Sequence, residues 1–273
     1  MSVRVAVLQM TAGIDPAGNA VTVADAAAAA AAGGAAMLFT PEMSGFLDRD
    51  RARAAATIRA EAEDVVLAAA CRAAADRAIW IVVGSLAIDR GDGAWANRSF
   101  AIGPDGAIRA RYDKMHMFDV DLAGGESWRE SRAYRAGDQV VTVPDTPAGV
   151  LGLAVCYDLR FPALFEALGR RRCDMIAVPA AFTVPTGRAH WHILQRARAI
   201  EASAFVVAAA QVGEHEDGRR TYGHSLVVDP WGEVLLDMGD EAPGIGFAEM
   251  DLARIAEVRA QLPSLANRRE IAT

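Results

Sequence analysis

A thiol lies where an apolar run of the sequence ends. Residues 151–155 are apolar, and Cys156 follows them directly, with an acid and an arginine just behind it in the segment CYDLRFP. A strand that ends in a sharp turn exposes a side chain and directs backbone N–H groups at an oxyanion, which is the geometry that a nucleophile needs. A lone cysteine in an apolar strand is more commonly a small buried hydrophobe, and that interpretation suits Cys71 and Cys173. For Cys156 the position leaves both interpretations open.

Two further segments carry groups that could serve a thiol nucleophile. Glu42 follows the apolar run of MLFTPE. A carboxylate partly buried at a strand end can carry protons near neutral pH, although a loop glutamate is more commonly solvated. Lys114 and His116 lie among apolar and aromatic residues in ARYDKMHMF. A lysine there either extends to solvent or is held beside anions, where its charge lowers a thiol pKa and stabilises an oxyanion. A pair of Cys156 with His116 or His224 is the alternative arrangement.

The elements that must position these groups alternate along the chain. Strands are predicted for VRVAVLQM, AAMLFTPE, IWIVVGSLAI, residues 150–155 and DMIAVPAAF, and helices for residues 25–32, 59–77, 162–172 and 187–204. ANRSFAIGPDGAIRARYDK predicts a hairpin closed by Gly-Pro-Asp-Gly. The predicted strands are too many for one open sheet, so we expect two packed sheets with helices on both outer faces. The expected fold class is α/β, a four-layer αββα sandwich of two mixed sheets in one domain, residues 1–273.

Composition and charge exclude several classes of function. The chain has 273 residues and a net charge of −7, which argues against binding to a nucleic-acid backbone. Three cysteines without a CxxC pair predict neither a disulfide framework nor a zinc site, and they fit a reducing compartment. The apolar run near the start is too short for a signal peptide, and the alanine tract 26–32 is too short to span a bilayer. We therefore expect a cytoplasmic protein without membrane contact.

Three segments resemble, in the same order, the motifs of the nitrilase (carbon–nitrogen hydrolase) superfamily. They are Pro41-Glu42, YDKMH around Lys114, and VCYDLRFP around Cys156. The resemblance continues through GRAHWHILQRARAIEA, TYGHSLVVDPWGEV and LPSLANRR, and so it covers essentially the whole chain. It implies a cysteine-dependent amidase in which Cys156 attacks the amide and Glu42 moves the protons. Lys114 and a backbone N–H near Tyr157 are then the donors to the oxyanion.

The family also carries a second glutamate between its lysine and its cysteine. Glu130, in a Glu-Ser pair, matches it, and the resemblance makes it a group that orients Lys114 and the substrate; Glu126 is expected to be an exposed loop residue. Asp158 and Arg160 are interpreted as supports of the turn after Cys156. The implied chemistry uses no metal and no cofactor.

Within the superfamily the chain looks most like the branch of deaminated-glutathione amidases and omega-amidases. This likeness implies hydrolysis of a terminal carboxamide on a small carboxylate-bearing substrate, giving an acid and ammonia, and we favour deaminated glutathione. The alternatives are 2-oxoglutaramate or 2-oxosuccinamate, as for an omega-amidase, and N-carbamoyl amino acids. Phe182, Thr183 and His116 are candidate substrate contacts, and Arg160 or Arg188 could supply the cation for a substrate carboxylate.

The resemblance also implies a homodimer or larger homo-oligomer, with roughly residues 250–273 as a tail that contacts another subunit. Two hypotheses from other classes stay open: a Cys–His hydrolase of the papain type, and a catalytically idle binding module. His190 and His192 have a spacing that hints at a metal, but positions i and i+2 of a helix do not share a face. We therefore interpret this pair as packing or surface residues.

Overall fold

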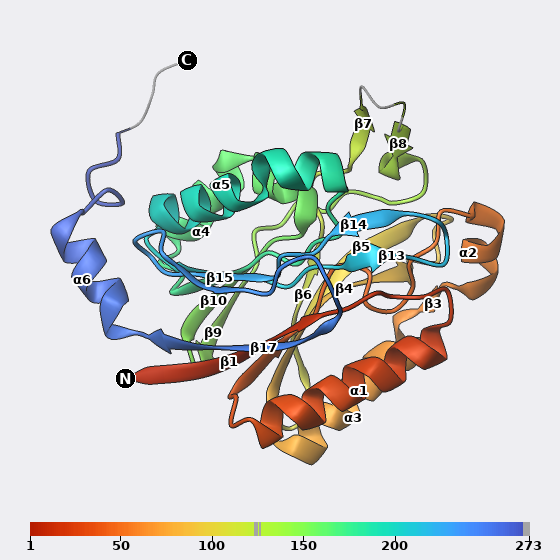
Figure 1. The fold of residues 1–273 in the computed structure, drawn as a ribbon, viewed down its shortest axis with the longest axis horizontal. Coiled ribbons are helices and arrows are strands. Elements are labelled where there is room, and N and C mark those ends of the chain that lie inside the picture. Colours follow the sequence, from red (N-terminus) through yellow and green to blue (C-terminus); the bar gives the residue numbers. More distant parts are fainter. Residues whose placement is uncertain (123–124, 126, 270–273) are drawn as a thin grey trace.

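The fold is a sandwich of four layers. The computed structural model describes residues 1–122, 125 and 127–269. Two sheets pack face to face; α1 (Pro16–Ala32) and α3 (Val65–Arg77) cover one outer face, and α4 (Pro162–Arg170) and α5 (Val184–Ala202) cover the other (Figure 1). The expected αββα architecture with two mixed sheets is therefore confirmed.

The first sheet comes mainly from the N-terminal half of the chain. Its strand order is β17-β1-β2-β4-β5-β6, with β3 paired to β4. The bounds are β1 (Ser2–Gln9), β2 (Met37–Phe39), β3 (Arg59–Ala60), β4 (Trp80–Asp89), β5 (Trp95–Ile102), β6 (Ile108–Asp113) and β17 (Gly244–Asp251). Strands β1, β2 and β4 run parallel, so their carboxyl ends meet at one edge of the sheet. The turn that carries Glu42 follows β2 at this edge.

The second sheet is also mixed, and its central strands are parallel. Its order is β16-β15-β12-β11-β10-β9, and β10, β11 and β12 run parallel. The bounds are β9 (Thr142–Thr146), β10 (Gly149–Leu153), β11 (Met175–Ala177), β12 (Phe205–Ala208), β15 (Leu226–Val228) and β16 (Val234–Asp237). Cys156 follows β10 and begins the 3₁₀ helix η3 (Cys156–Arg160). Glu42 and Cys156 therefore lie at the ends of parallel strands, one in each sheet.

Short elements lie around these strand ends. They are α2 (Arg51–Thr57), the hairpin β7 (Asp119–Asp121) with β8 (Ser127–Arg129), the 3₁₀ helix η2 (Glu130–Arg132), and the hairpin β13 (Val212–Glu214) with β14 (Arg220–Tyr222). Figure 1 shows α2 and both hairpins at the end of the molecule opposite α6 (Ala253–Gln261). They enclose the site described below.

Alternating side chains of β1 enter different layers of the core. Val5 and Val7 belong to the cluster between the two sheets. Ala6 and Leu8 belong to the cluster under α1 and α3. Because successive side chains of a strand point to opposite faces, a central strand with apolar residues at every position is buried on both sides. This explains why the strands read as continuous apolar runs.

Several element boundaries differ from the prediction. The expected helix over residues 59–77 is wrong in its first part, because Asp64 caps α3 by accepting hydrogen bonds from Val66 N and Leu67 N. The residues before Asp64 form β3 and the 3₁₀ helix η1 (Glu61–Glu63). Similarly α1 begins at Pro16, earlier than expected, under a cap from Asp15. None of the helices in the described residues has the length and apolar character needed to cross a membrane.

The last described residues pack on their own chain. Arg259 of α6 donates to the carbonyl of Cys173 and lies 3.1 Å from Asp174 Oδ1. Arg268 donates to the carbonyls of Glu166 and Glu201. These contacts anchor the segment after α6 to the ends of α4 and α5. The expected contact of this tail with another subunit stays a prediction, and residues 270–273 lie outside the described part.

Candidate active site

The turn after β10 holds Cys156 in an uncommon backbone conformation. Its φ is +51°, in the left-handed region that side chains with a Cβ rarely adopt. The Cys156 N–H donates to the carbonyl of Pro179 at 2.8 Å, which fixes the turn against the neighbouring chain. The side chain is buried, with 7% of the residue exposed. Such strain persists only where surrounding contacts determine it, and it is characteristic of functional positions.

Asp158 makes many of the contacts that hold the turn at Cys156 in place. Its fully buried carboxylate accepts hydrogen bonds from the Tyr112 hydroxyl at 2.7 Å and from the Val155 N–H at 2.9 Å. The same carboxylate contacts the backbone N–H of His116 at 3.0 Å and its Nδ1 at 2.7 Å. Asp158 thus joins the end of β10 to the segment after β6, and both carry candidate groups.

Glu42 is held at both oxygens of its carboxylate. Oε1 lies 3.0 Å from Lys114 Nζ and accepts a hydrogen bond from Asn97 Nδ2 at 2.9 Å. Oε2 accepts the backbone N–H of Ala181 at 2.9 Å. The Cys156 thiol lies close enough to this carboxylate for each group to shift the pKa of the other. A buried carboxylate beside a thiol, with its other contacts fixed, is arranged to receive the thiol proton.

Lys114 lies between two carboxylates. Its Nζ is 2.8 Å from Glu130 Oε2 and 3.1 Å from Glu130 Oε1, in addition to the Glu42 contact. Glu130 is fixed in turn by Asn97 Nδ2 at 2.9 Å and by the backbone N–H of Phe118 at 2.7 Å. One amide nitrogen of Asn97 therefore binds both glutamates, and the three charged groups form one network.

The protonation states follow from burial and from this network. Burial and the Glu42 carboxylate raise the pKa of the Cys156 thiol well above its ordinary value, and the Lys114 charge does not offset them. Burial would also raise the pKa of Glu42, but the Lys114 ammonium and hydrogen bonds from Cys156 and Asn97 hold this pKa below its ordinary value. Burial opposes the ammonium of Lys114, yet Glu130 and Glu42 raise its pKa well above the ordinary value. At rest the site is a thiol, a carboxylate and an ammonium.

This state corrects one expectation from the sequence. Lys114 was expected to lower the pKa of a nearby thiol, and its charge does act in that direction. Desolvation and the Glu42 charge outweigh it, so the net shift of the Cys156 pKa is upward. If Cys156 is the nucleophile, as the motif implies, its thiol has to give its proton to a nearby base before or during attack, and the Glu42 carboxylate is next to it.

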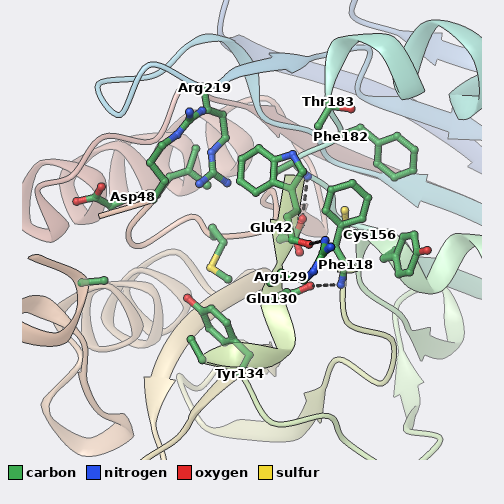
Figure 2. Close-up of a pocket in the computed structure, with 18 of the residues that line it drawn as sticks. Glu42, Asp48, Phe118, Arg129, Glu130, Tyr134, Cys156, Phe182, Thr183 and Arg219 are labelled. Atoms are coloured by element: carbon green, nitrogen blue, oxygen red, sulfur yellow. Dashed lines mark hydrogen bonds between the residues drawn. The ribbon is translucent and has the colours of Figure 1, made fainter. Parts of the chain in front are cut away.

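These groups face a cavity of about 1000 Å³. Figure 2 shows Cys156, Glu42 and Glu130 gathered in one part of this cavity, with the Cys156 sulfur near the Glu42 side chain. Aromatic side chains and arginines form much of the remaining lining: Phe46, Trp95, Phe118, Trp128, Tyr134, Tyr157, Phe182, Arg49, Arg51, Arg129, Arg132, Arg160, Arg219 and Arg220. Seven arginines and Lys114 outnumber the three acids of the lining, Glu42, Asp48 and Glu130, so the cavity suits an anionic ligand.

The hairpin of β7 and β8 contributes one wall of this cavity. The Arg219 guanidinium lies 4.8 Å from the ring centroid of Trp128, and that of Arg49 lies 5.5 Å from it. Both arginines also contact Asp217, at 3.0 Å and 3.7 Å respectively. These contacts tie the hairpin to the loop before β14 and to the loop before α2.

Comparison with known proteins agrees with this geometry. The family model for carbon-nitrogen hydrolases matches residues 4–260. The chain belongs to the carbon-nitrogen hydrolase family. The resemblance in the sequence motifs is thereby confirmed.

Several curated relatives of this carbon-nitrogen hydrolase carry the name deaminated glutathione amidase. The one from Synechocystis is 45% identical over 173 residues, covering 63% of this chain and 63% of the relative. The match thus spans less than two thirds of that relative's length. The human protein is 38% identical over 271 residues, covering 97% of this chain and 82% of the relative. The crystal structure of the C. elegans NitFhit protein has a TM-score of 0.89 at 37% identity, covering 98% of this chain and 65% of that one.

The other residues singled out in the sequence of this carbon-nitrogen hydrolase divide into two groups. Tyr157, Arg160, Phe182 and Thr183 line the cavity, as expected for substrate contacts and for the turn after the cysteine. His116 is not among the described residues that line it, because its ring is bound to Asp158 and stacks on Phe161 at 3.6 Å. The cavity lining therefore gives no support to His116 as a substrate contact, which stays a prediction.

Two other candidates stand apart from the cavity. Arg188 is also missing from the described lining, whereas Arg160 is present and lies 5.4 Å from the ring centroid of Phe182. Glu126, expected to be an exposed loop residue, lies outside the described residues. No histidine is found in the described part of the cavity wall, which removes the support for a Cys–His pair.

Sequence reasoning missed several groups of the site. Asn97 is the most important, because it bonds both glutamates. A polar residue within the apolar strand WANRSFAI was the available sign of it, since a buried amide needs partners. Ala181 contributes only its backbone N–H, which no pattern of side chains reveals. Arg132 and Arg220 line the cavity from elements that were not predicted.

Proposed function

We propose that this carbon-nitrogen hydrolase is a cysteine-dependent amidase acting on a small anionic amide, with deaminated glutathione as the favoured substrate. The observation that carries the proposal is the convergence of Cys156, Glu42 and Lys114 on one cavity, with the Lys114 ammonium 3.0 Å from the Glu42 carboxylate. A buried thiol, base and cation in contact match the requirements of nucleophilic acyl transfer.

In the proposed first half-reaction, the Cys156 sulfur attacks the amide carbonyl carbon while its proton passes to Glu42. The carbonyl oxygen becomes an oxyanion, which the Lys114 ammonium stabilises, together with a backbone N–H near Tyr157. When the carbon–nitrogen bond breaks, the leaving amine takes the proton from Glu42. A thioester on Cys156 remains.

In the second half-reaction, Glu42 removes a proton from a water molecule that attacks the thioester carbonyl. The carbon–sulfur bond breaks, Cys156 recovers its proton from Glu42, and the carboxylic acid leaves. Glu130 acts as the positioning residue for Lys114, because both its oxygens contact Nζ. Asn97 holds the two carboxylates in place through one amide nitrogen.

The substrate proposal rests on the cavity and on the relatives. Several relatives are named deaminated glutathione amidase. Deaminated glutathione has two carboxylates, and the cavity offers several guanidinium groups to bind them. Arg132 and Arg220 suit this role because, within the described residues, neither has a hydrogen bond or ion pair to an acidic side chain. Arg160 can bind the second carboxylate.

The chemistry of this substrate changes one expectation about the product. Deaminated glutathione has no primary carboxamide, so cleavage next to its 2-oxo acid end releases Cys-Gly as the amine rather than ammonia. Ammonia is the expected product only for substrates such as 2-oxoglutaramate. The two activities can therefore be distinguished by the amine released.

The decisive experiment measures products by mass spectrometry after incubation with deaminated glutathione, 2-oxoglutaramate or an N-carbamoyl amino acid. We expect 2-oxoglutarate and Cys-Gly from the first compound with wild type, and no turnover with Cys156→Ala. Equal product from both proteins would refute a Cys156 mechanism. Turnover of only the carbamoyl compound would retain the mechanism and refute the substrate.

The proposal also covers the domain organisation, the oligomeric state and the cellular location of the enzyme. We infer one hydrolase domain over residues 1–273 that forms a homodimer or larger homo-oligomer, in a cytoplasmic location. Ile193, Trp231 and Leu262 are large apolar residues that are 69%, 48% and 50% exposed, which supports a further covering surface. Multi-angle light scattering gives the oligomeric state directly, and a monomer would exclude the dimer.

A further inference from the structure

Two histidines and an aspartate meet where α5, the loop after β14 and β16 come together. His192 Nε2 is 3.0 Å from Asp237 Oδ2, and His224 Nδ1 is 2.9 Å from Asp237 Oδ1. One potential metal-binding atom from each side chain lies within 4.8 Å of those of the other two. In the described part of the chain, no other three His, Cys, Asp or Glu side chains are grouped in this way. None of the three lines the described wall of the Cys156 cavity.

The backbone of His224 is fixed on both sides. Its N–H donates to the carbonyl of Gly239 at 2.7 Å, and its carbonyl accepts the indole N–H of Trp191 at 2.8 Å. Its φ of +53° lies in the left-handed region, so these contacts hold a conformation that costs energy. The imidazole also stacks on Tyr222, with ring centroids 4.4 Å apart. The direction of this side chain is thus set before any ligand binds.

The other two side chains are also oriented by contacts. The Asp237 carboxylate accepts the backbone N–H of Gly239 at 2.9 Å, a second-sphere bond of the kind that orients metal ligands. The ring of His192 lies edge-on to that of His224, with centroids 4.9 Å apart. All three side chains keep access to solvent, since 34% of the His192 and Asp237 side chains and 20% of His224 are exposed. An ion can therefore reach the group, and water can complete its coordination.

Two imidazole nitrogens and one carboxylate oxygen form a ligand set that Zn²⁺ and neighbouring first-row cations accept, with water in the open position. Tetrahedral bonds of about 2.0–2.1 Å place ligand atoms about 3.3 Å apart. Asp237 Oδ2 lies 3.0 Å from His192 Nε2 and 3.2 Å from His224 Nδ1, so these two contacts would have to open by at most a few tenths of an ångström. A nitrogen of each imidazole lies within 4.8 Å of the other, and the rings would approach when an ion binds. Each imidazole would bind through its lone pair and keep its proton on the other ring nitrogen.

We propose that His192, His224 and Asp237 form a binding site for Zn²⁺ or a related divalent transition-metal cation, separate from the catalytic cavity. The ion would join α5 to β16. Thr183 and Thr186, at the start of α5, line the cavity, so the site braces a helix that carries part of the substrate-binding wall. The proposal does not depend on the identity of the substrate.

The test is titration of purified full-length protein with ZnCl₂ by calorimetry and with CoCl₂ by visible absorption. We expect one ion per chain and a melting temperature that rises with metal concentration. The visible absorption of bound Co²⁺ should be that of an ion with a low coordination number. His192→Ala and the near-isosteric Asp237→Asn should each weaken binding at least tenfold. His190→Ala is the matched control, because this exposed imidazole lies on the same helix beside Arg160 and should leave metal binding unchanged.

The Cys156 thiol is a competing zinc ligand, so the titration is repeated with Cys156→Ala. Binding that persists in Cys156→Ala and weakens in both His192→Ala and Asp237→Asn supports the proposed site. Binding that disappears in Cys156→Ala but persists in the other two variants assigns the ion to the catalytic cavity and overturns the proposal. Absence of binding to wild type also overturns the proposal. The three side chains would then only connect α5 to β16 by hydrogen bonds. Circular dichroism verifies that each variant is folded.

Discussion

Lys114 Nζ lies 3.0 Å from Glu42 Oε1, and both side chains are almost completely buried. A charge pair inside a protein is stable only when hydrogen bonds satisfy the remaining atoms of both groups. Here Asn97 and Ala181 bond Glu42, while Glu130 binds the other side of the ammonium. The pair is therefore arranged to act as proton acceptor and cation in the proposed mechanism, and it joins the segments that follow β2 and β6 of the first sheet.

Glu42→Gln is expected to lower kcat by about 10²- to 10⁴-fold, since it removes the general base but keeps the shape of the side chain. Lys114 retains Glu130 as a counter-ion in this variant, so the protein should remain folded. Steady-state kinetics with the best amide substrate, combined with a melting curve, test both statements. Turnover close to wild type would show that another group accepts the thiol proton.

Lys114→Met is expected to destabilise the fold by about 3–5 kcal/mol, because it leaves the buried Glu42 carboxylate and the partly buried Glu130 carboxylate without this counter-ion. The pKa of Glu42 should rise in this variant, since the ammonium is one of the groups that hold it down. Urea denaturation at neutral pH measures the loss of stability. In the double variant Lys114→Met/Glu42→Gln one of the uncompensated charges is gone, so part of the stability should return. Equal loss in the single and double variants would contradict this explanation.

The upward shift of the Cys156 pKa predicts a loss of stability in alkali. The thiol of the unfolded chain loses its proton near the ordinary value of 9.0, whereas the folded thiol keeps it to higher pH. The unfolded state therefore binds fewer protons above that value, and the free energy of unfolding falls as pH rises, by about 1.4 kcal/mol per pH unit for one group. Urea denaturation between about pH 8 and pH 10 under reducing conditions should show a weaker pH dependence for Cys156→Ala than for wild type. Identical slopes would exclude a raised pKa for this thiol.

Asp158→Asn is expected to lower kcat with little change in KM, because the carboxylate shapes the turn that carries Cys156. Several donors converge on this buried group, and an amide cannot accept from all of them, so we expect a loss of stability of about 1–3 kcal/mol. The comparison variant is His116→Ala, which removes only one of these side-chain contacts and should retain most activity. If His116→Ala abolished turnover while Glu42→Gln did not, a Cys–His mechanism would be favoured.

The sequence predicted the layers of the fold and the three central groups for the same physical reason. Apolar runs identify buried strands, and a reactive side chain directly after such a run lies at the edge of a sheet. Cys156 and Glu42 fulfil this rule, and the motif around Lys114 follows the predicted hairpin of β5 and β6. These positions depend on local pattern, which a sequence displays directly.

What the sequence could not predict depends on register and on contacts between distant segments. Asn97 reaches both glutamates because its carbonyl accepts the N–H of Lys114 at 2.9 Å, a pairing set by the register of β5 and β6. The short helix α2 and the hairpin of β7 and β8 have too few residues for a clear period. His224 and Asp237 meet His192 only through the packing of α5 on the second sheet. Such relationships appear only in three dimensions.

Gly84 of β4 lies where both reactive segments approach the sheet. A Cβ at this position would clash with the carbonyl of Pro41, directly before Glu42, and with the ring of Pro179. The carbonyl of Pro179 accepts the N–H of Cys156. One glycine thus permits the close approach of the segment before the base and of the residue that fixes the nucleophile.

Gly84→Ala is therefore expected to lower both stability and kcat, although the new methyl group touches no reacting atom. Overpacking of a buried site costs about 1–3 kcal/mol, and displacement of either segment would lengthen the contact between the Cys156 thiol and the Glu42 carboxylate. Gly244→Ala is the matched control, because this strand glycine has only Met238 within 4 Å of a new Cβ. Melting curves and kcat measure the two effects. If Gly84→Ala behaved like Gly244→Ala in both, close packing behind the site would have no part in aligning the thiol with its base.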